Sequence, residues 1–444
     1  NLHIDKAPNN VPLVNIEAPN SQGTSHNVFR EYNVGKEGVI LNNALDLENS
    51  KLGGLIYGNP NLQKDRKTAS TILTEISGTH RSKLEGFTEI VGGKADYILA
   101  NPNGIYINGS GFINTGNVKM MTAGSQNNFE VESGKIEIAG KGLDVRNINK
   151  AELIARVAEL SAPIYGGEEL NIALGSKSQK DKPEYSLDAR ALGSMYAGRI
   201  HIVSSEDGVG VKSAAPMYAT KGDVILDTKG KVYLKDTQAK NNISIKAKET
   251  QVEEKLIAEK GIKLASEKIR NRGNLAANTN IIMQGDVENE KWIFSNGTVN
   301  ISGNIKNKGE IKAKHHITLR GEELENRGLI LSHQNLNIHS RDIHNFDKLI
   351  AENNVEIEND RIKNIGKIYS DQNIKINSRK IENHKDILAL GNIELESKTL
   401  VNNEKIQANG NIHIRSKNIE SENIFANHVT INTDKIESTK IITK

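Results

Sequence analysis

Side chains that could do acid/base chemistry are scattered through the second half of the sequence. They include the carboxylates of Asp342, Asp347, Asp360, Asp371 and Asp386. A site that cleaves polysaccharide needs carboxylates that converge on one bond. This part of the chain repeats every nineteen residues, and these aspartates fall at different positions within the repeat. The spacing argues against a shared acid/base centre, so we expect no enzymatic activity in this chain.

The histidines also lack a pattern that would bind a metal. They share no single column of the repeat: His315, His316, His333, His339, His344, His384, His413 and His428. The sequence contains no cysteine, which excludes thiolate ligands and disulfides. It also lacks glycine-rich phosphate loops, calcium-binding nonapeptides and nucleophile motifs. We therefore expect no metal site and no cofactor.

The repeat itself must position these side chains. One apolar column with a spacing of nineteen consists of Ile305, Leu324, Ile343, Ile362, Ile381, Leu400 and Ile419. Further apolar columns start at Ile311, Ile317 and Leu319, and the last two alternate as in a strand. Apolar runs at helical spacing are too short for a helix. Each unit is predicted to form one coil of a parallel β-helix with about three short strands, rising roughly 4.8 Å per coil.

Asparagines form a second kind of column, two residues after the apolar anchors. Its members are Asn307, Asn326, Asn345, Asn364, Asn383 and Asn402. Asparagine amides stacked one coil above another can hydrogen-bond along the axis of the array. We interpret this column as a structural ladder, and a row of polar ligands is the alternative.

The composition fits a narrow aliphatic core inside a polar coat. Aromatic residues make up 4% of the 444 residues, and the mean hydropathy is -0.51. The net charge of +3 comes from interleaved lysine and glutamate, which does not predict a nucleic-acid-binding face. No apolar run is long enough to cross a membrane as a helix. Residues 1–23, with Pro8, Pro12 and Pro19, are predicted to cap the open end of the solenoid.

Two near-copies of one turn motif stand in the first half of the chain. The first is Asn59, Pro60, Asn61 and Leu62, and the second is Asn101, Pro102, Asn103, Gly104 and Ile105. Proline presets φ in a four-residue turn, asparagine side chains bond nearby backbone, and glycine accepts a positive φ. Residue chemistry alone predicts two well-specified turns.

Several motifs in the same order resemble the secretion domain of two-partner-secretion exoproteins, the family of filamentous haemagglutinins, secreted haemolysins and contact-dependent inhibition proteins. They include residues 25–27, 39–44, 59–62, 100–107, 111–115, 191–198 and 208–211. The nineteen-residue units that follow resemble the haemagglutinin repeats of that family. Relatives that carry a cysteine pair in this domain differ from this chain, so no role for that pair transfers.

The resemblance implies an all-β fold, a right-handed parallel β-helix with an N-terminal cap and small extra-helical β elements. It implies a secretion domain over residues 1–245 and a shaft of haemagglutinin repeats over residues 246–444. A cognate outer-membrane β-barrel transporter would recognise the secretion domain. Either the two turn motifs contact that transporter, or they are turns without which the domain cannot fold.

Local expectations follow for the stretches between these motifs. Residues 151–160 could form a short amphipathic helix, but the resemblance favours strands. Residues 176–185 are predicted to form an exposed loop. Apolar anchors continue the shaft upstream at Val252, Ile269 and Val287, and Trp292 and Phe294 are expected to fill the core at the transition.

The favoured hypothesis is an exoprotein fragment, secreted or held at the cell surface of a Gram-negative bacterium, whose shaft displays a distal adhesin or toxin. We expect the protein to continue beyond residue 444, where a receptor on a host cell or neighbouring bacterium would be engaged. We expect this chain to be a monomer that binds no nucleic acid. The alternatives are that it is itself an adhesin for host surfaces, or a β-helical polysaccharide-degrading enzyme.

Overall fold

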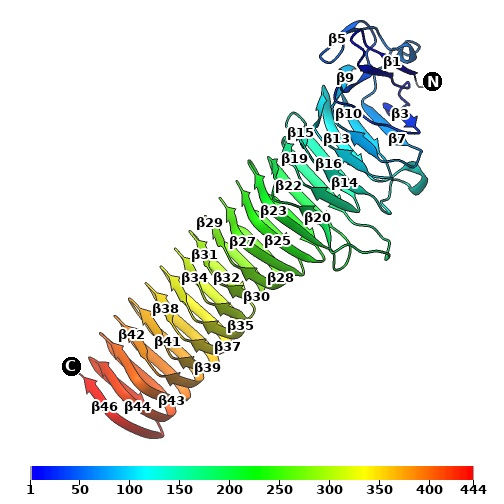
Figure 1. Ribbon diagram of the computed structural model, residues 1–444. Coiled ribbons are helices and arrows are strands. Elements are labelled where there is room, and N and C mark those ends of the chain that lie inside the picture. Colours follow the sequence, from blue (N-terminus) through cyan, green and yellow to red (C-terminus); the bar gives the residue numbers. More distant parts are fainter. Residues whose placement is uncertain (1–2, 444) are drawn as a thin grey trace. The chain divides into compact units, whose positions relative to one another are not determined.

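The computed structural model describes residues 3–443, which form strands and two short 3-10 turns, η1 (Pro60–Leu62) and η2 (Ser125–Asn127). The chain divides into two compact units. Unit 1 comprises Asn1–Lys240 with Lys246–Lys248, and unit 2 comprises Asn241–Ile245 with Glu249–Lys444. Within each unit, strands stack on one another coil by coil in parallel register (Figure 1). The predicted all-β parallel solenoid is confirmed.

Unit 1 begins with an antiparallel pair. β1 (His3–Lys6) pairs with β2 (Pro12–Asn15), and β2 starts the parallel stacking on β4. Three stacks of strands follow. The first holds β3 (Thr24–Phe29), β7 (Thr71–Ile76), β10 (Ala95–Ala100), β13 (Thr115–Met121), β16 (Lys150–Ala155), β19 (Glu169–Leu174), β22 (Arg199–Ser204) and β24 (Val224–Thr228).

The second stack holds β8 (Ser82–Leu84), β11 (Ile105–Ile107), β14 (Lys135–Ile138), β17 (Val157–Leu160), β20 (Tyr185–Ala189), β23 (Gly210–Ala219) and β25 (Lys231–Ala239). The third holds β2, β4 (Val39–Asn43), β9 (Phe87–Gly92), β12 (Ser110–Ile113), β15 (Leu143–Val145), β18 (Ile164–Gly166), β21 (Met195–Ala197) and the end of β23. A separate two-stranded sheet joins β5 (Glu48–Ser50) and β6 (Gly54–Ile56) in antiparallel fashion.

Unit 2 also has three stacks. Two of them share long strands that turn a corner: β26 (Ile243–Lys246), β27 (Glu249–Ala258), β28 (Ile262–Asn271), β30 (Ile281–Asn289), β32 (Val299–Ser302), β33 (Ile305–Asn307), β35 (Ile317–Asn326), β37 (Leu336–Asn345), β39 (Val355–Asn364), β41 (Ile374–Asn383), β43 (Ile393–Ala408), β44 (Asn411–Ala426), β45 (His428–Asn432) and β46 (Lys435–Thr443). The third stack holds β29 (Asn274–Ala277), β31 (Trp292–Ser295), β34 (Glu310–Ala313), β36 (Leu329–Ser332), β38 (Lys348–Ala351), β40 (Lys367–Ser370) and β42 (Asp386–Ala389), together with the C-terminal ends of β27, β43, β44 and β46.

The register of unit 2 follows the nineteen-residue period. Ile305 pairs with Leu324, Leu324 with Ile343, and each later anchor with the next. All seven anchors are buried. The core is thus a set of aliphatic columns that run along the stack, each side chain packed on its counterparts one coil away.

Two predictions about the upstream coils were wrong. Thr250, not Val252, pairs with Ile269, and Val252 lies beside Asn271. Trp292 and Phe294 point outward, with 48% of Trp292 exposed, while Ile293 between them is buried. The physical reason is the two-residue alternation of a strand, which sends neighbours to opposite faces whatever their size.

Two ambiguous stretches of unit 1 are also resolved. Residues 150–160 form β16 and β17, so the strand interpretation is confirmed over the amphipathic helix. The predicted loop lies between β19 and β20, although Tyr185 already belongs to β20. A search of the described residues finds no α-helix with the length and hydropathy of a membrane span.

Candidate functional site

The first turn motif is built around a buried asparagine. Asn59 is fully buried and caps η1, since its side-chain oxygen accepts from the Asn61 N–H at 2.9 Å. Its Nδ2 donates to the carbonyls of Ile16 and Asn42, both at 2.9 Å. The Asn61 amide adds a 3.1 Å bond to the Ile16 carbonyl. Asn59 therefore joins its own turn to two chain segments, around Ile16 and Asn42, that are distant in sequence.

The second motif repeats this plan. Asn101 is fully buried, and its Nδ2 donates to the His80 carbonyl at 3.0 Å and to Ser82 Oγ at 2.9 Å. Its Oδ1 accepts from the Asn103 N–H at 2.9 Å. Gly104 has a φ of +116°, a left-handed conformation that favours glycine.

The first asparagine of each motif donates from Nδ2 to a distant backbone carbonyl and accepts at Oδ1 from the N–H two residues later. In each, the first asparagine uses its amide for hydrogen bonds within the chain, to backbone carbonyls and, for Asn101, also to Ser82 Oγ, and it presents no surface to solvent. Leu62 and Ile105 are buried in the core. Pro60 and Asn103 are exposed. A direct contact with a partner protein would have to use these exposed atoms, because the buried asparagines are inaccessible without local unfolding.

An extra-helical hairpin stands next to the first motif. β5 and β6 are held by Glu89, which is 4% exposed and accepts from Ser50 Oγ at 2.6 Å, Lys51 N at 2.8 Å and Leu52 N at 2.9 Å. The hairpin region carries the exposed side chains of Leu47, Leu55 and Tyr57. Sequence reasoning missed this anchor because its partners lie 37 to 39 residues away.

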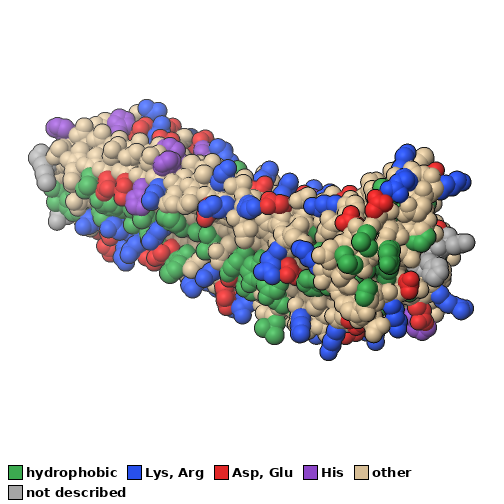
Figure 2. Space-filling model, turned by 90° about the horizontal axis from the view of Figure 1, so that it is seen from above, with side chains coloured by type: hydrophobic (Ala, Val, Ile, Leu, Met, Phe, Trp, Pro, Cys, Tyr) green, Lys and Arg blue, Asp and Glu red, His purple; other side chains and the backbone are tan. Residues whose placement is uncertain are grey.

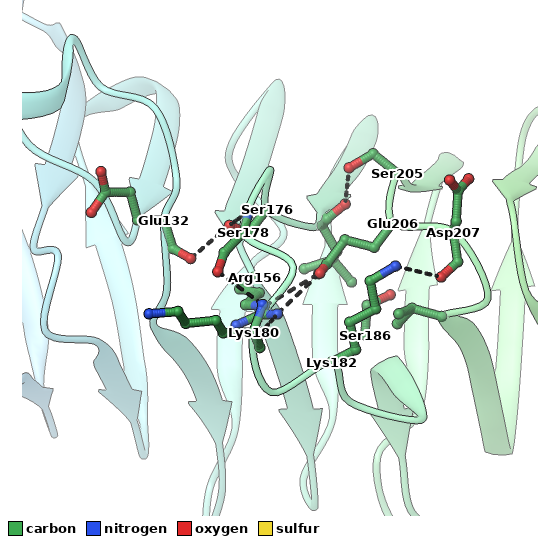
Figure 3. Close-up of polar contacts among 12 residues, drawn as sticks. Glu132, Arg156, Ser176, Ser178, Lys180, Lys182, Ser186, Ser205, Glu206 and Asp207 are labelled. Carbon is green, nitrogen blue, oxygen red and sulfur yellow. Dashed lines mark hydrogen bonds and ion pairs between the residues drawn. The ribbon is translucent and has the colours of Figure 1, made fainter.

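A buried ion pair fixes the loop between β19 and β20 (Figure 3). The Arg156 guanidinium binds the Glu206 carboxylate with Nη2 to Oε1 at 3.1 Å, and 11% and 2% of these side chains are exposed. Arg156 also donates to the Lys180 carbonyl at 2.6 Å, and Ser176 Oγ donates to the Glu132 carbonyl at 2.6 Å. The loop is therefore tied to the coils beneath it through its backbone.

Another buried carboxylate, Glu75, links β7 to the η2 turn. It accepts from Ser125 N at 2.8 Å and from the Ser125 hydroxyl, and His26 Nε2 lies 3.0 Å from its Oε2. Burial alone would raise the pKa of Glu75. The hydrogen bonds from Ser125 and His26 outweigh burial, so the pKa lies below its ordinary value.

The predicted asparagine ladder lies inside unit 2. Each Nδ2 donates to the Oδ1 of the next member at 2.8 to 2.9 Å, and also to backbone carbonyls, from Asn307 through Asn402. Asn271 and Asn289 extend the ladder upstream, and Ser421 accepts from Asn402 at 3.1 Å at the other end. Asn271, Asn289 and Asn307 are spaced by eighteen residues, so a search of the sequence for asparagines nineteen residues apart does not find the first two.

A shallow groove of about 580 Å³ runs over β35, β37 and β39, and its lining includes Asp342, His344 and Arg361. The Asp342 carboxylate accepts from Arg361 Nε at 3.0 Å and from Arg341 Nε at 3.3 Å, so it is already neutralised by two cations. Among residues 3–443, no three histidine or acidic side chains are grouped as a metal ion would require. Glu323, which is in register with Asp342 one coil away, also lines the groove.

Comparison with known proteins points to one family. The family model described as "TPS secretion domain" matches residues 1–234. A "tRNA nuclease CdiA" of Escherichia coli O6:K15:H31 is 35% identical over 377 residues, which covers 75% of this chain and 11% of that protein. A "16S rRNA endonuclease CdiA" of Enterobacter cloacae is 41% identical over 267 residues, with 56% and 8% covered. The chain thus spans about a tenth of the length of these relatives.

Among solved structures, the crystal structure of a filamentous hemagglutinin secretion domain is similar. The TM-score is 0.48 with 26% sequence identity, and the match covers 65% of this chain and 94% of that chain.

Proposed function

This chain belongs to the family of two-partner-secretion (TPS) secretion domains, and from that premise we propose that its N-terminal unit is recognised by a cognate outer-membrane β-barrel transporter. Members of the family are secreted or displayed on the surface of Gram-negative bacteria. The repeats of unit 2 form a shaft that carries a distal adhesin or toxin. The single observation that carries this proposal is the family match over residues 1–234. The nuclease names belong to relatives roughly ten times longer than the aligned segment.

The stacking of unit 2 suits a chain that folds as it emerges from a transporter. Each strand pairs in parallel with strands one coil away, as β37 does with β35 where Leu336 lies beside Ile317. A coil that has left the pore can therefore complete its bonds on the coil before it. Each buried aliphatic side chain contributes roughly 1.5 to 3 kcal/mol before conformational entropy is subtracted. Folding outside would then favour outward movement without a nucleotide.

Within unit 1, we assign Asn59 and Asn101 to folding rather than to direct contact. Both are fully buried and use their amides on neighbouring segments. Recognition would then fall to exposed parts of the folded or folding domain, and loss of either asparagine would weaken secretion by preventing the domain from folding.

Secretion of residues 1–444 tests both parts of the proposal. Wild type and Asn101→Ala would be expressed with and without the transporter, and the amount in the medium compared with the thermal midpoint of each purified chain. We expect export to require the transporter, and Asn101→Ala to lose export and stability together. Export without the transporter would refute the secretion-domain assignment. Lost export with unchanged stability would make Asn101 part of the recognition surface.

A further inference from the structure

One outer face of unit 2 is apolar where a solvated sheet would be polar. In the stack that contains β31 to β42, alternate residues point outward, and exposed sheet faces normally carry polar residues there. The outward column, paired coil by coil, reads Ile257, Ala276, Phe294, Lys312, Leu331, Ile350, Tyr369, Leu388, Gln407 and Phe425. We call this column the apolar stripe.

Residues beside the stripe widen it. Trp292 and Leu390 are each 48% exposed, and Ile365 is 37% exposed. Hydrophobic side chains are visible along one side of the repeats in Figure 2. Contiguous apolar surface of this kind marks an interaction site on soluble proteins.

The charges beside the stripe change sign along it. On the strands themselves, Glu310 is followed two and three coils later by Lys348 and Lys367. Directly after the strands, Lys314 and His333 are followed by Glu352 and Asp371. The column on the strands also carries Lys255, Asp386 and Lys405 farther from the centre. The central part of this surface, from Glu310 to Asp371, complements its own reverse.

We propose that the apolar stripe pairs face to face with the same stripe of a second copy, with the two shafts antiparallel. The two-fold axis lies between the coil of Leu331 and the coil of Ile350. Because every coil rises by the same step, this register aligns the whole stripe. It sets Leu331 against Ile350, Phe294 against Leu388, Lys312 against Tyr369, and Ile257 against Phe425. This inference rests on the repeats alone and revises the monomer expected from sequence.

The charges select this register. The same axis sets Glu310 against Lys367 and Lys314 against Asp371, each an attractive pair. His333 and Glu352 already pair within each chain, with 2.7 Å between Nδ1 and Oε1, and the axis brings the two copies of this pair together. Moving the axis by half a coil, onto Ile350, would set Glu310 against Asp386 and Lys348 against its own copy. Moving it half a coil the other way, onto Leu331, would set Lys255 against Lys405. Like charges in contact oppose association, so both shifted registers are disfavoured.

The available area is sufficient for a specific dimer. Ten coils at roughly 4.8 Å per step, and about 20 Å across a strand with its flanking residues, give a footprint on the order of 800 to 900 Å² per copy. Standard specific interfaces bury about 800 Å² per partner. Two sheet faces pack face to face at a usual separation of about 10 Å.

Sedimentation of the full 1–444 chain tests the pairing. We expect a reversible dimer, with dissociation at least tenfold easier in Leu331→Lys and unchanged in the matched control Ile282→Lys, which places the same charge on an outward position of β30. Lys314→Glu should weaken the dimer, and adding Asp371→Lys should restore it. Circular dichroism would verify that each variant remains folded.

The absence of cysteine allows the orientation to be tested by crosslinking. Phe294→Cys mixed with Leu388→Cys should form a disulfide-linked dimer, whereas Phe294→Cys alone should not, because the two copies of that residue lie about five coils apart, roughly 24 Å. Crosslinking of Phe294→Cys with itself would refute the antiparallel arrangement. A wild-type chain that stays monomeric at about 100 µM, or a dimer that Leu331→Lys leaves intact, would refute the pairing. A monomer that floats with lipopolysaccharide vesicles would instead make the stripe a membrane contact.

Discussion

At the scale of single residues, buried polar side chains hold this solenoid together between its coils. Asn326 shows the pattern. It accepts from Asn307 at 2.9 Å and donates to Asn345 at 2.9 Å and to the carbonyls of Gly328 and Lys348, each at 2.9 Å. Removing such a group leaves buried partners unsatisfied, which costs more than the bond itself contributes.

Asn326→Ala should therefore destabilise unit 2 by about 1 to 3 kcal/mol. A calorimetric scan of the purified chain would show the lower thermal midpoint. Asn337→Ala is the matched control, because Asn337 lies on the outward side of β37. Equal midpoints for the two variants would contradict a structural role for the ladder.

The Glu75 carboxylate predicts a dependence on pH. Its pKa is lower in the folded chain than in the unfolded chain, so its stabilising contribution is present above the unfolded pKa and is lost as pH falls through the folded pKa. Glu75→Gln should lower the melting temperature at pH 7, and this difference from wild type should shrink as pH falls through the folded pKa. A difference between wild type and variant that persists undiminished at acid pH would count against this linkage.

Which of these residues could be predicted from sequence depends on how far away their partners lie. The ladder from Asn307 onward follows from a fixed spacing of nineteen, whereas Asn271, Asn289 and Asn307 are spaced by eighteen. The turn chemistry of Asn59 is local, but its bonds to Ile16 and Asn42 span 43 and 17 residues. The size of Trp292 suggests a core position, but Ile293 beside it is buried, and the inward–outward alternation of a strand then sends Trp292 outward.

At the scale of elements, the extra-helical hairpin depends on one carboxylate. Glu89 accepts from a hydroxyl and two backbone N–H groups of the segment that joins β5 to β6. Asn9 Nδ2 also donates to the Leu52 carbonyl at 2.7 Å, and Ile56 lies in a core cluster against which Leu52 packs. Loss of the three bonds to Glu89 should still lower the free energy of local opening relative to that of global unfolding.

Glu89→Ala should make residues 45–58 sensitive to limited proteolysis while the coils stay resistant. Mass spectrometry of the first fragments would locate the cut. Glu85→Ala, a neighbouring carboxylate that is half-buried, serves as the control. Cleavage first in the coils, or none at all, would show that Glu89 does not anchor the hairpin.

At the scale of the whole molecule, the nineteen-residue period of the repeats determines which deletions the fold can accommodate. Deleting residues 346–364 removes one complete unit and joins Asn345 to Ile365, so every remaining side chain keeps its column. We expect this variant to fold with a thermal midpoint close to wild type, because stability in such arrays is a sum over neighbouring repeats. Deleting residues 346–354 alone shifts the columns, and a strong loss of β-structure by circular dichroism should follow. Similar spectra for the two deletions would contradict the column model.

We propose that the N-terminal unit directs export and that the repeats follow it. The most direct measurement fuses residues 1–248 to an unrelated, unstructured passenger, and compares its appearance in the medium with that of residues 249–444 alone, each with and without the transporter. We predict that the fusion is exported only when the transporter is present and that the repeats alone stay inside. Export of the repeats alone, or of the fusion without the transporter, would contradict the account.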